Sequence, residues 1–383
     1  MDLNDYFQPV SLEKPRLFFF ESDASFSKTI EVHTDNNLVK DIDAFDIAII
    51  GVEEERNSVN KGTAKAPDEV RGKLYQLAGI NKKLNIIDLG NLKNAPGVMD
   101  TYHGLKDVIL YLYHNNVIPI IIGGSQDLTI SNFWASEKLN SPFSFTSVDS
   151  RFDFQPGENP YGSFSYLQKI FEGHDKIFDF TNLGYQTYFV SKEELKYLSD
   201  LGYQAKRLGV VQQDIPRVEP VIRDADFMSV DISAVRHSEA PGYFAPSPHG
   251  LYGEQLCQIA RYAGLSSRLK SFGIYEINPT HDINQLTSNL AAQVIWYFID
   301  GVSQRNDEIP GKNNNIKKFI VSLNNKDKIV FYRSDISERW WIEIPVLKSN
   351  QKNRIISCSV EDYEKTCNQE IPDIWIRFFN KLN

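Results

Sequence analysis

The stretch VIPIIIGGSQD, residues Val117–Asp127, decides the fold of this chain. A nearly continuous run of β-branched residues as far as Ile122 is typical of a strand that is buried on both faces. Two glycines follow the run, and the polar residue Gln126 comes soon after them. Open α/β sheets bind their ligands at the carboxyl edge, where such a residue lies. The stretch therefore predicts a buried parallel strand and a site just beyond its end.

The same alternation extends over residues 45–305. Amphipathic stretches with apolar residues at helical spacing separate further short apolar runs. Strands that alternate with helices favour parallel pairing, so the pattern predicts a three-layer α/β/α domain with a mainly parallel sheet. The other strand-like runs are residues 47–50, 84–89, 143–148, 227–230 and 272–275, and the helical stretches are residues 105–112, 256–263 and 291–298.

Two segments flank the α/β domain, for which we expect the bounds 45–310. Residues 1–44 form an N-terminal arm that contains Phe18–Phe20. Residues 311–383 form a C-terminal extension packed on the core, which begins with a β-hairpin over residues 317–333 and continues with a third strand over residues 340–345. Ser359 and Asp362 have the spacing of a capping box and predict a helix after the third strand.

Composition limits the possible partners. The chain has 383 residues, a net charge of -9 and a pI near 5.4, and its basic residues are scattered. This excludes nucleic acid and anionic membranes as expected partners. We see no signal peptide and no apolar run long enough to span a membrane. The three cysteines are odd in number and widely spaced, so we expect a reducing, cytoplasmic location.

Polar side chains follow four of the predicted strands. Gln126, Asp149, Asp231 and Glu276 each come at a carboxyl end, and Asp153 follows Asp149 by four residues. Because these ends share one edge of the sheet, we expect a common site there. The chain has neither a His-Glu-x-x-His pair nor a Gly-Lys-Ser/Thr phosphate loop, so a zincin or a P-loop protein is not supported.

The segments around these residues resemble the arginase and agmatinase (ureohydrolase) family. The resemblance covers about residues 45–305 and implies the arginase-like fold and a pair of manganese ions. It is carried by Gly123–Asp127, Asp149–Asp153 and Ser229–Ser233, and also by residues 66–71, 240–251 and 276–279.

Position by position, the resemblance assigns the first ion to Gln126, Asp149, Asp153 and Asp231. The second ion would need Arg151, Asp149, Asp231 and Ser233. The family has His at the positions of Gln126 and Arg151 and Asp at the position of Ser233. A guanidinium stays protonated and offers only donors, so Arg151 cannot ligate a metal. We therefore expect no binuclear manganese site; the remaining oxygens suit at most one hard ion, Mn, Mg or Ca.

Two arrangements of charge remain open. Three aspartates with Arg151 in the place of the second ion leave a charge of -2, which one divalent ion would neutralise. If Arg236 also turns inward, the charge falls to -1 and no metal is needed. Glu276 matches the family's carboxylate for the substrate guanidinium, but it could instead form an ion pair with Arg151 or Arg236. Tyr161 stands where the family has a proton-shuttling His.

Two functions follow from these departures. The first is a non-catalytic member of the family, kept as a scaffold for a protein partner or self-association, or as a binder of a guanidino or amino-acid ligand. Trp340, Trp341 and Trp375 could add interface for such a partner. The alternative is a divergent formimidoylglutamase-like hydrolase of a C–N amidine bond that uses at most one metal ion. In that case Asp149, Asp231 and Glu276 would be the catalytic residues.

Overall fold

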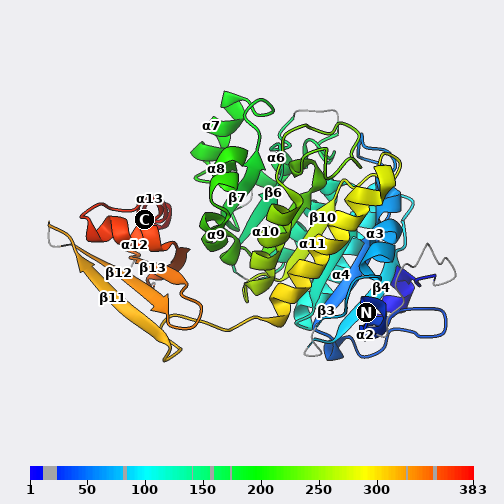
Figure 1. Cartoon of the computed structure of the whole chain (residues 1–383), viewed down its shortest axis with the longest axis horizontal. Helices are drawn as coiled ribbons and strands as arrows, with labels where there is room; N and C mark the ends of the chain where they lie inside the picture. The colour runs from blue at the N-terminus through cyan, green and yellow to red at the C-terminus, as the bar shows by residue number, and fades with distance from the viewer. Residues whose placement is uncertain are drawn as a thin grey trace.

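The computed structural model describes residues 1–11, 24–80, 84–139, 141–155, 159–172, 175–324, 327–347 and 352–383. Its main body has three layers, with helices on both faces of a ten-stranded sheet (Figure 1). The strand order is β1-β4-β3-β5-β10-β9-β6-β7-β8, with β2 also beside β4. Every neighbouring pair is parallel except β1 and β4. The predicted three-layer fold with a mainly parallel sheet is confirmed.

The strands of this sheet are β1 Phe7–Gln8, β2 Glu31–Val32, β3 Ile47–Val52, β4 Ile86–Leu92, β5 Ile118–Gly123, β6 Phe143–Val148, β7 Ile177–Tyr185, β8 Gln204–Arg207, β9 Phe227–Asp231 and β10 Ser271–Tyr275. The α-helices of the main body are α1 Leu3–Tyr6, α2 Phe26–Thr29, α3 Ala66–Leu74, α4 Val98–His114, α5 Thr129–Glu137, α6 Tyr166–Phe171, α7 Lys192–Asp200, α8 Leu208–Gln213, α9 Glu219–Arg223, α10 Gly253–Leu265 and α11 Leu286–Ser303. None of the helices in the described part of the chain has the length and apolarity needed to cross a bilayer.

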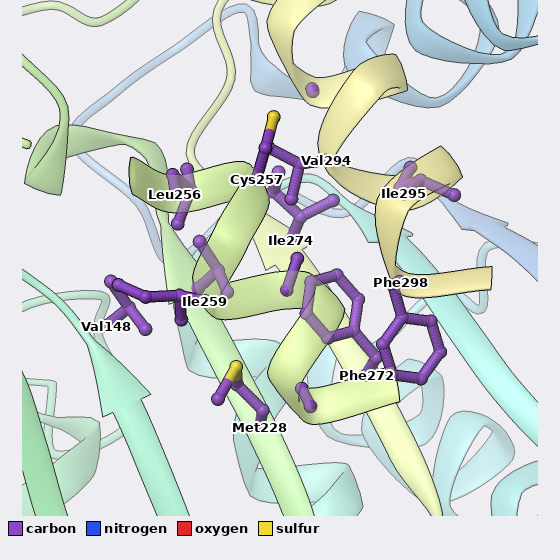
Figure 2. Close-up of a cluster of buried hydrophobic side chains, with 14 of the residues drawn as sticks. Val148, Met228, Leu256, Cys257, Ile259, Phe272, Ile274, Val294, Ile295 and Phe298 are labelled. Carbon is purple, nitrogen blue, oxygen red and sulfur yellow. The ribbon is translucent and has the colours of Figure 1, made fainter. Parts of the chain in front are cut away.

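Helices α3, α10 and α11 lie against one face of the sheet, and α4 lies against the other. Phe272 on β10 stacks on Phe298 of α11 with ring centroids 4.5 Å apart, and both rings are fully buried (Figure 2). Burying an aromatic ring between a strand and a helix stabilises the fold by several kcal/mol, roughly 3–5 by the cost of truncation. This contact therefore fixes the position of β10 relative to α11, and Glu276 directly follows the last residue of β10.

The N-terminal segment adds to the sheet next to β4. Strand β1 pairs antiparallel with β4, and β2 pairs parallel with its first half. The segment thus supplies edge strands, while Phe18–Phe20 lie outside the described residues.

The C-terminal segment forms a second, four-stranded antiparallel sheet with two helices (Figure 1, orange to red). The expected hairpin and third strand are present, and the capping box of Ser359 and Asp362 opens the next helix. A fourth strand was not predicted. This module touches the main body where Arg377 pairs with Asp179 and Phe378 stacks on Phe178. Its elements are β11 Ile316–Ser322, β12 Lys328–Ser334, β13 Trp340–Ile344, β14 Arg354–Cys358, α12 Val360–Cys367 and α13 Asp373–Leu382.

Candidate functional site

Four adjacent strands carry the candidate site at their carboxyl ends. Strands β5, β10, β9 and β6 are neighbours in the sheet and lead to Gln126, Glu276, Asp231 and Asp149 respectively. All four side chains are buried, and so is Asp153 in the loop after β6. The structure therefore brings together the five residues that the sequence placed at one edge.

A glycine allows the ends of the strands to meet. At Gly124 a Cβ atom would lie 2.0 Å from the carbonyl oxygen of Glu54, so no larger residue fits. The Gly124 carbonyl accepts a hydrogen bond from the backbone N–H of Glu276 at 2.8 Å. The next turn brings the backbone N–H of Gln126 to 3.0 Å from the Glu276 carboxylate, to which it donates. Gly124 and Gln126 thus join the end of β5 to the loop that follows β10.

Glu276 is held by neutral donors. Its carboxylate accepts hydrogen bonds from the Ser58 hydroxyl at 3.3 Å and from the Asn60 amide at 3.0 Å, besides the Gln126 N–H. Its backbone has a φ of +64°, a left-handed conformation that a glutamate adopts at a cost of about 1–3 kcal/mol. Among the described residues no cationic side chain lies within ion-pair distance of Glu276, so the proposed ion pair with Arg151 or Arg236 is wrong.

The three aspartates are oriented by their own loops. Asp149 accepts from the backbone N–H of Arg151 at 2.8 Å, and Asp231 accepts from that of Ser233 at 2.6 Å. Asp153 has a φ of +50°, and its Oδ2 atom has no hydrogen-bond partner within the described part of the chain. Backbone strain and missing partners are typical of a functional site rather than of a structural ion pair.

Burial raises the pKa of every carboxyl in this group, which we call the acidic cluster (Asp149, Asp153, Asp231 and Glu276). The pKa of Asp149 is raised to about 6 and that of Glu276 to about 8. The pKa values of Asp153 and Asp231 are also raised by burial and then by the charge of Asp149. The cluster therefore needs protons or a cation to balance its charge.

We expect the metal-free protein to lose stability as the pH rises. Folding raises the pKa of Asp149 from 3.8 to about 6 and that of Glu276 from 4.5 to about 8. Between the lower and the higher value of each residue, the native state binds more protons than the unfolded state. Stability falls with pH wherever the native state binds more protons than the unfolded state. The measurement is Tm in chelating buffer across this pH range for the wild type and for Glu276→Gln.

The difference between the two proteins isolates Glu276. The Tm of the wild type should fall more steeply toward pH 8 than that of Glu276→Gln, which cannot ionise. Identical slopes for the two proteins would contradict the raised pKa of Glu276.

Arg151 does not occupy the middle of the acidic cluster. Its guanidinium carbon lies 3.8 Å from the ring centroid of Phe189 and 5.9 Å from that of Phe164. No carboxylate among the described residues is within ion-pair distance of it. We predicted that this guanidinium would lie in the position of the second metal ion, and the structure corrects that prediction. The guanidinium instead makes cation–π contacts with the two rings, and these contacts take the place of an ion pair. Burial is the largest influence on the pKa of Asp149 and raises it. The charge of Arg151 lowers this pKa, but less than the hydrogen bonds to Asp149 do.

Arg236 and Ser233 also have other partners. The guanidinium carbon of Arg236 lies 3.5 Å from the ring centroid of Tyr252, and its Nη2 donates to the Gly250 carbonyl at 3.3 Å. The expectation that Arg236 turns inward is therefore wrong. The hydroxyl of Ser233 lies 3.1 Å from that of Ser150. Neither residue neutralises the aspartates directly.

The oxygen donors of the first metal position fit one hard cation in their chemistry. The Gln126 amide is fully buried, and neither its oxygen nor its nitrogen has a hydrogen-bond partner in the described part of the chain. Carboxylate and amide oxygens without partners suit Mn, Mg or Ca. As the side chains stand, no three His, Cys, Asp or Glu residues of the described ranges come close enough to hold a metal ion. The donors would therefore have to close on an ion in order to bind it.

The structure adds residues that the sequence did not single out. Ser58 and Asn60, in the loop after β3, hold Glu276, and a polar loop at the same sheet edge was the available signal. Tyr166 is buried beside Asp153, whose charge helps to raise the pKa of the tyrosine after burial itself. Tyr161, expected in place of a proton shuttle, packs against Trp134 with ring centroids 6.3 Å apart. Within the described residues it makes no hydrogen bond or ring contact with the acidic cluster.

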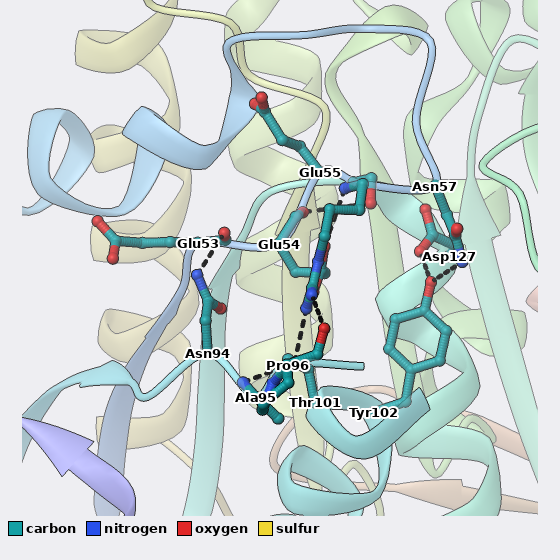
Figure 3. A network of polar contacts seen from close by, with 12 residues as sticks. Glu53, Glu54, Glu55, Asn57, Asn94, Ala95, Pro96, Thr101, Tyr102 and Asp127 are labelled. Atoms are coloured by element: carbon teal, nitrogen blue, oxygen red, sulfur yellow. Dashed lines mark hydrogen bonds and ion pairs between the residues drawn. The ribbon is translucent and has the colours of Figure 1, made fainter. Parts of the chain in front are cut away.

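A second polar network anchors the loop that carries Ser58 and Asn60 (Figure 3). Arg56 pairs with the buried Glu54 and donates to Thr101 of α4 at 3.1 Å. Asn57 donates at 2.8 Å to the hydroxyl of Tyr102, which itself donates to Asp127. These bonds attach the loop to α4 and to the turn after β5. They therefore restrain the positions of Ser58 and Asn60, the two side chains that donate to Glu276.

Comparison with known proteins places this geometry in context. The family model described as "Arginase family" matches residues 45–300. The formimidoylglutamase of Staphylococcus haemolyticus is 25% identical over 255 residues, covering 64% of this chain and 81% of that protein. The formimidoylglutamase of Bacillus subtilis is 24% identical over 313 residues, covering 74% and 97%.

Solved structures show the same fold. The formiminoglutamase of Trypanosoma cruzi, solved with Mn2+2, superposes with a TM-score of 0.66 at 20% identity, covering 70% of this chain and 97% of that one. The formimidoylglutamase of Bacillus subtilis gives a TM-score of 0.67 at 21% identity, covering 77% and 97%. The family match covers strands β3 to β10 and the edge that carries the acidic cluster, whereas β1, β2 and the whole C-terminal module lie outside it.

Proposed function

The chain belongs to the arginase family, and we propose that it is a divergent hydrolase of a C–N amidine bond that uses at most one divalent ion. Formimidoylglutamate is the substrate to test first, because the similar curated proteins are formimidoylglutamases. Water would add to the amidine carbon and the C–N bond would break, which releases formamide and the free amino acid. The three free cysteines suit a reducing, cytoplasmic compartment.

One observation carries this proposal: the acidic cluster is buried and lacks ion pairs among the described residues. An amidinium or guanidinium group supplies a delocalised positive charge and several N–H donors. Glu276 lies in a strained loop and is held only by neutral donors, so it can bind such a cation without breaking an ion pair. The positive charge would lower the pKa of Glu276 from its raised value of about 8 and favour the carboxylate. The site thus favours a cationic substrate.

The aspartates support the chemical step. Of the two cluster carboxyls whose pKa is given, Asp149 at about 6 is ionised at neutral pH, so it can accept a proton from the attacking water. Gln126, Asp149, Asp153 and Asp231 would hold the ion. When bound, a divalent ion would supply Lewis acidity toward the substrate and the attacking water. Arg151 offers no ligand for a second ion, since it is a permanent cation, and Ser233 offers only a neutral hydroxyl in the place of a carboxylate.

A substrate panel tests the proposal. The purified full chain, supplied with Mn, is assayed with formimidoylglutamate, arginine, agmatine and guanidinobutyrate, and released formamide or urea is measured. We expect turnover of formimidoylglutamate to exceed that of the three guanidino compounds by at least about tenfold, or about 1.4 kcal/mol. Absence of turnover with all four compounds would contradict a hydrolase.

A second candidate function is a non-catalytic binding protein. The observation that favours it is that two positions of the family's second metal site carry Arg151 and Ser233, which contact Phe189 and Ser150 instead. Such a protein would bind a guanidino or amino-acid cation at the acidic cluster, or serve a protein partner or a second copy of itself. Saturable binding of formimidoylglutamate without turnover would support this function over the first.

A further inference from the structure

A cavity of about 690 Å³ lies between the main body and the C-terminal module. We call it the junction cavity. One side comes from η4 (Ile215–Val218) and α9, and the other from β13 and the start of α12. Its volume is within the range of about 300–1,000 Å³ that small-molecule sites occupy, and such sites are frequent between domains. It lies apart from the acidic cluster, none of whose residues lines it.

The buried wall of the junction cavity carries two guanidinium groups and one carboxylate. Arg223 and Arg339 both approach the same oxygen of Glu219, with their Nε atoms 3.6 Å and 3.1 Å from it. The three side chains are only 7%, 15% and 14% exposed, for Arg223, Arg339 and Glu219 respectively. An excess of positive charge that is so poorly hydrated is costly unless an anion balances it.

The guanidinium of Arg223 has N–H donors that are not used in hydrogen bonds within the described residues. Its Nη2 donates to the Trp340 carbonyl at 2.8 Å, and its guanidinium carbon lies 4.6 Å from the ring centroid of Trp341. Its Nη1 atom is buried and has no hydrogen-bond partner in the described part of the chain. A planar guanidinium that keeps N–H donors without a partner can bind an oxyanion through them.

The remaining charges of the lining lie at the rim. Arg217 pairs with Asp214 at 3.0 Å and with Glu361 at 2.7 Å, and Arg333 pairs with Glu338 at 2.5 Å. Arg217 is 56% exposed and Glu338 is 75% exposed, so water and salt screen these charges.

Burial lowers the pKa of Arg339, and the negative charge of Glu308 attracts this arginine and opposes that lowering, although Glu308 is not part of the lining. Its carboxylate is engaged by the hydroxyls of Ser334 and Ser337. The buried wall of the lining itself therefore has two guanidinium groups against the single carboxylate of Glu219.

We propose that the junction cavity binds a small dianion, either a phosphate group or a dicarboxylate, through Arg223 and Arg339. Because α9 belongs to the main body and Arg339 and Trp340 belong to the C-terminal module, the bound anion joins the two parts. This proposal does not depend on the hydrolase activity.

Calorimetric titration of the full chain tests the site, with inorganic phosphate and succinate as two separate probes. We expect at least one probe to bind the wild type, and Arg223→Met to weaken that binding at least about tenfold. Glu219→Gln should strengthen it about threefold or more, because it removes the carboxylate that competes for both guanidinium groups. The better probe identifies the class of anion.

Arg207→Met is the matched control, since Arg207 is exposed and does not line the junction cavity. It should bind the probe as the wild type does. If neither probe binds the wild type, or if Arg207→Met weakens binding as much as Arg223→Met, the proposal fails. Should Arg223→Met not fold, Glu219→Gln decides alone, and unchanged or weaker binding in that variant overturns the site.

Discussion

Replacing Asp149 by alanine is expected to lower kcat for formimidoylglutamate by about 10³-fold, the usual cost of removing a group that stabilises the transition state. Asp149, whose pKa is raised to about 6, is ionised at neutral pH, and it would contact the ion. Its removal therefore takes away both the proton acceptor and a metal ligand. Steady-state kinetics with added Mn measure the effect.

The control for this variant is Asp200→Ala. Asp200 is an exposed aspartate that pairs with Lys196 on α7 and is not a member of the acidic cluster, so its loss should leave kcat unchanged. Circular dichroism of both variants shows whether the fold is intact. A folded Asp149→Ala protein that keeps more than about a tenth of the wild-type kcat would contradict the role given to this carboxylate.

Replacing Phe272 by alanine is expected to lower the free energy of unfolding by about 3–5 kcal/mol. The ring is fully buried and stacks on Phe298, so its removal leaves a cavity between β10 and α11 that the rigid sheet cannot close (Figure 2). Urea denaturation followed by tryptophan fluorescence measures the change.

Tyr297→Ala serves as the matched control, since Tyr297 is the residue next to Phe298 on α11 and is 40% exposed. We expect this variant to lose about 1 kcal/mol or less. Equal losses for the two variants would mean that the stack of Phe272 on Phe298 does not dominate this layer.

The central strands could be predicted from the sequence, and the outer ones could not. Strand β5 is a short run rich in isoleucine and buried on both faces, which is typical of a strand in a parallel sheet. Strand β7 carries Asp179 and Asn182 among its apolar residues, and β8 is a partly exposed edge strand, so neither shows a clean period. Their positions depend on pairing with neighbours, which local patterns do not encode.

The same distinction applies to the site. Strand ends brought Gln126 and the acidic cluster to one edge, because parallel topology places carboxyl ends together. The direction of a long side chain does not follow from topology: Arg151 was expected among the aspartates and instead stacks on Phe189, which comes from the loop after β7. Ser58 and Asn60 were missed because their loop is far from Glu276 in the sequence.

The metal content of the active protein tests most directly whether the chain is a hydrolase that uses at most one divalent ion. The full chain is purified without chelator, loaded with Mn and freed of unbound ion, and the ions per chain are counted by mass spectrometry while turnover of formimidoylglutamate is followed. We expect activity to reach its maximum with at most one ion per chain, because Arg151 and Ser233 cannot complete a second set of ligands. Two tightly bound ions per chain at maximal activity would contradict this.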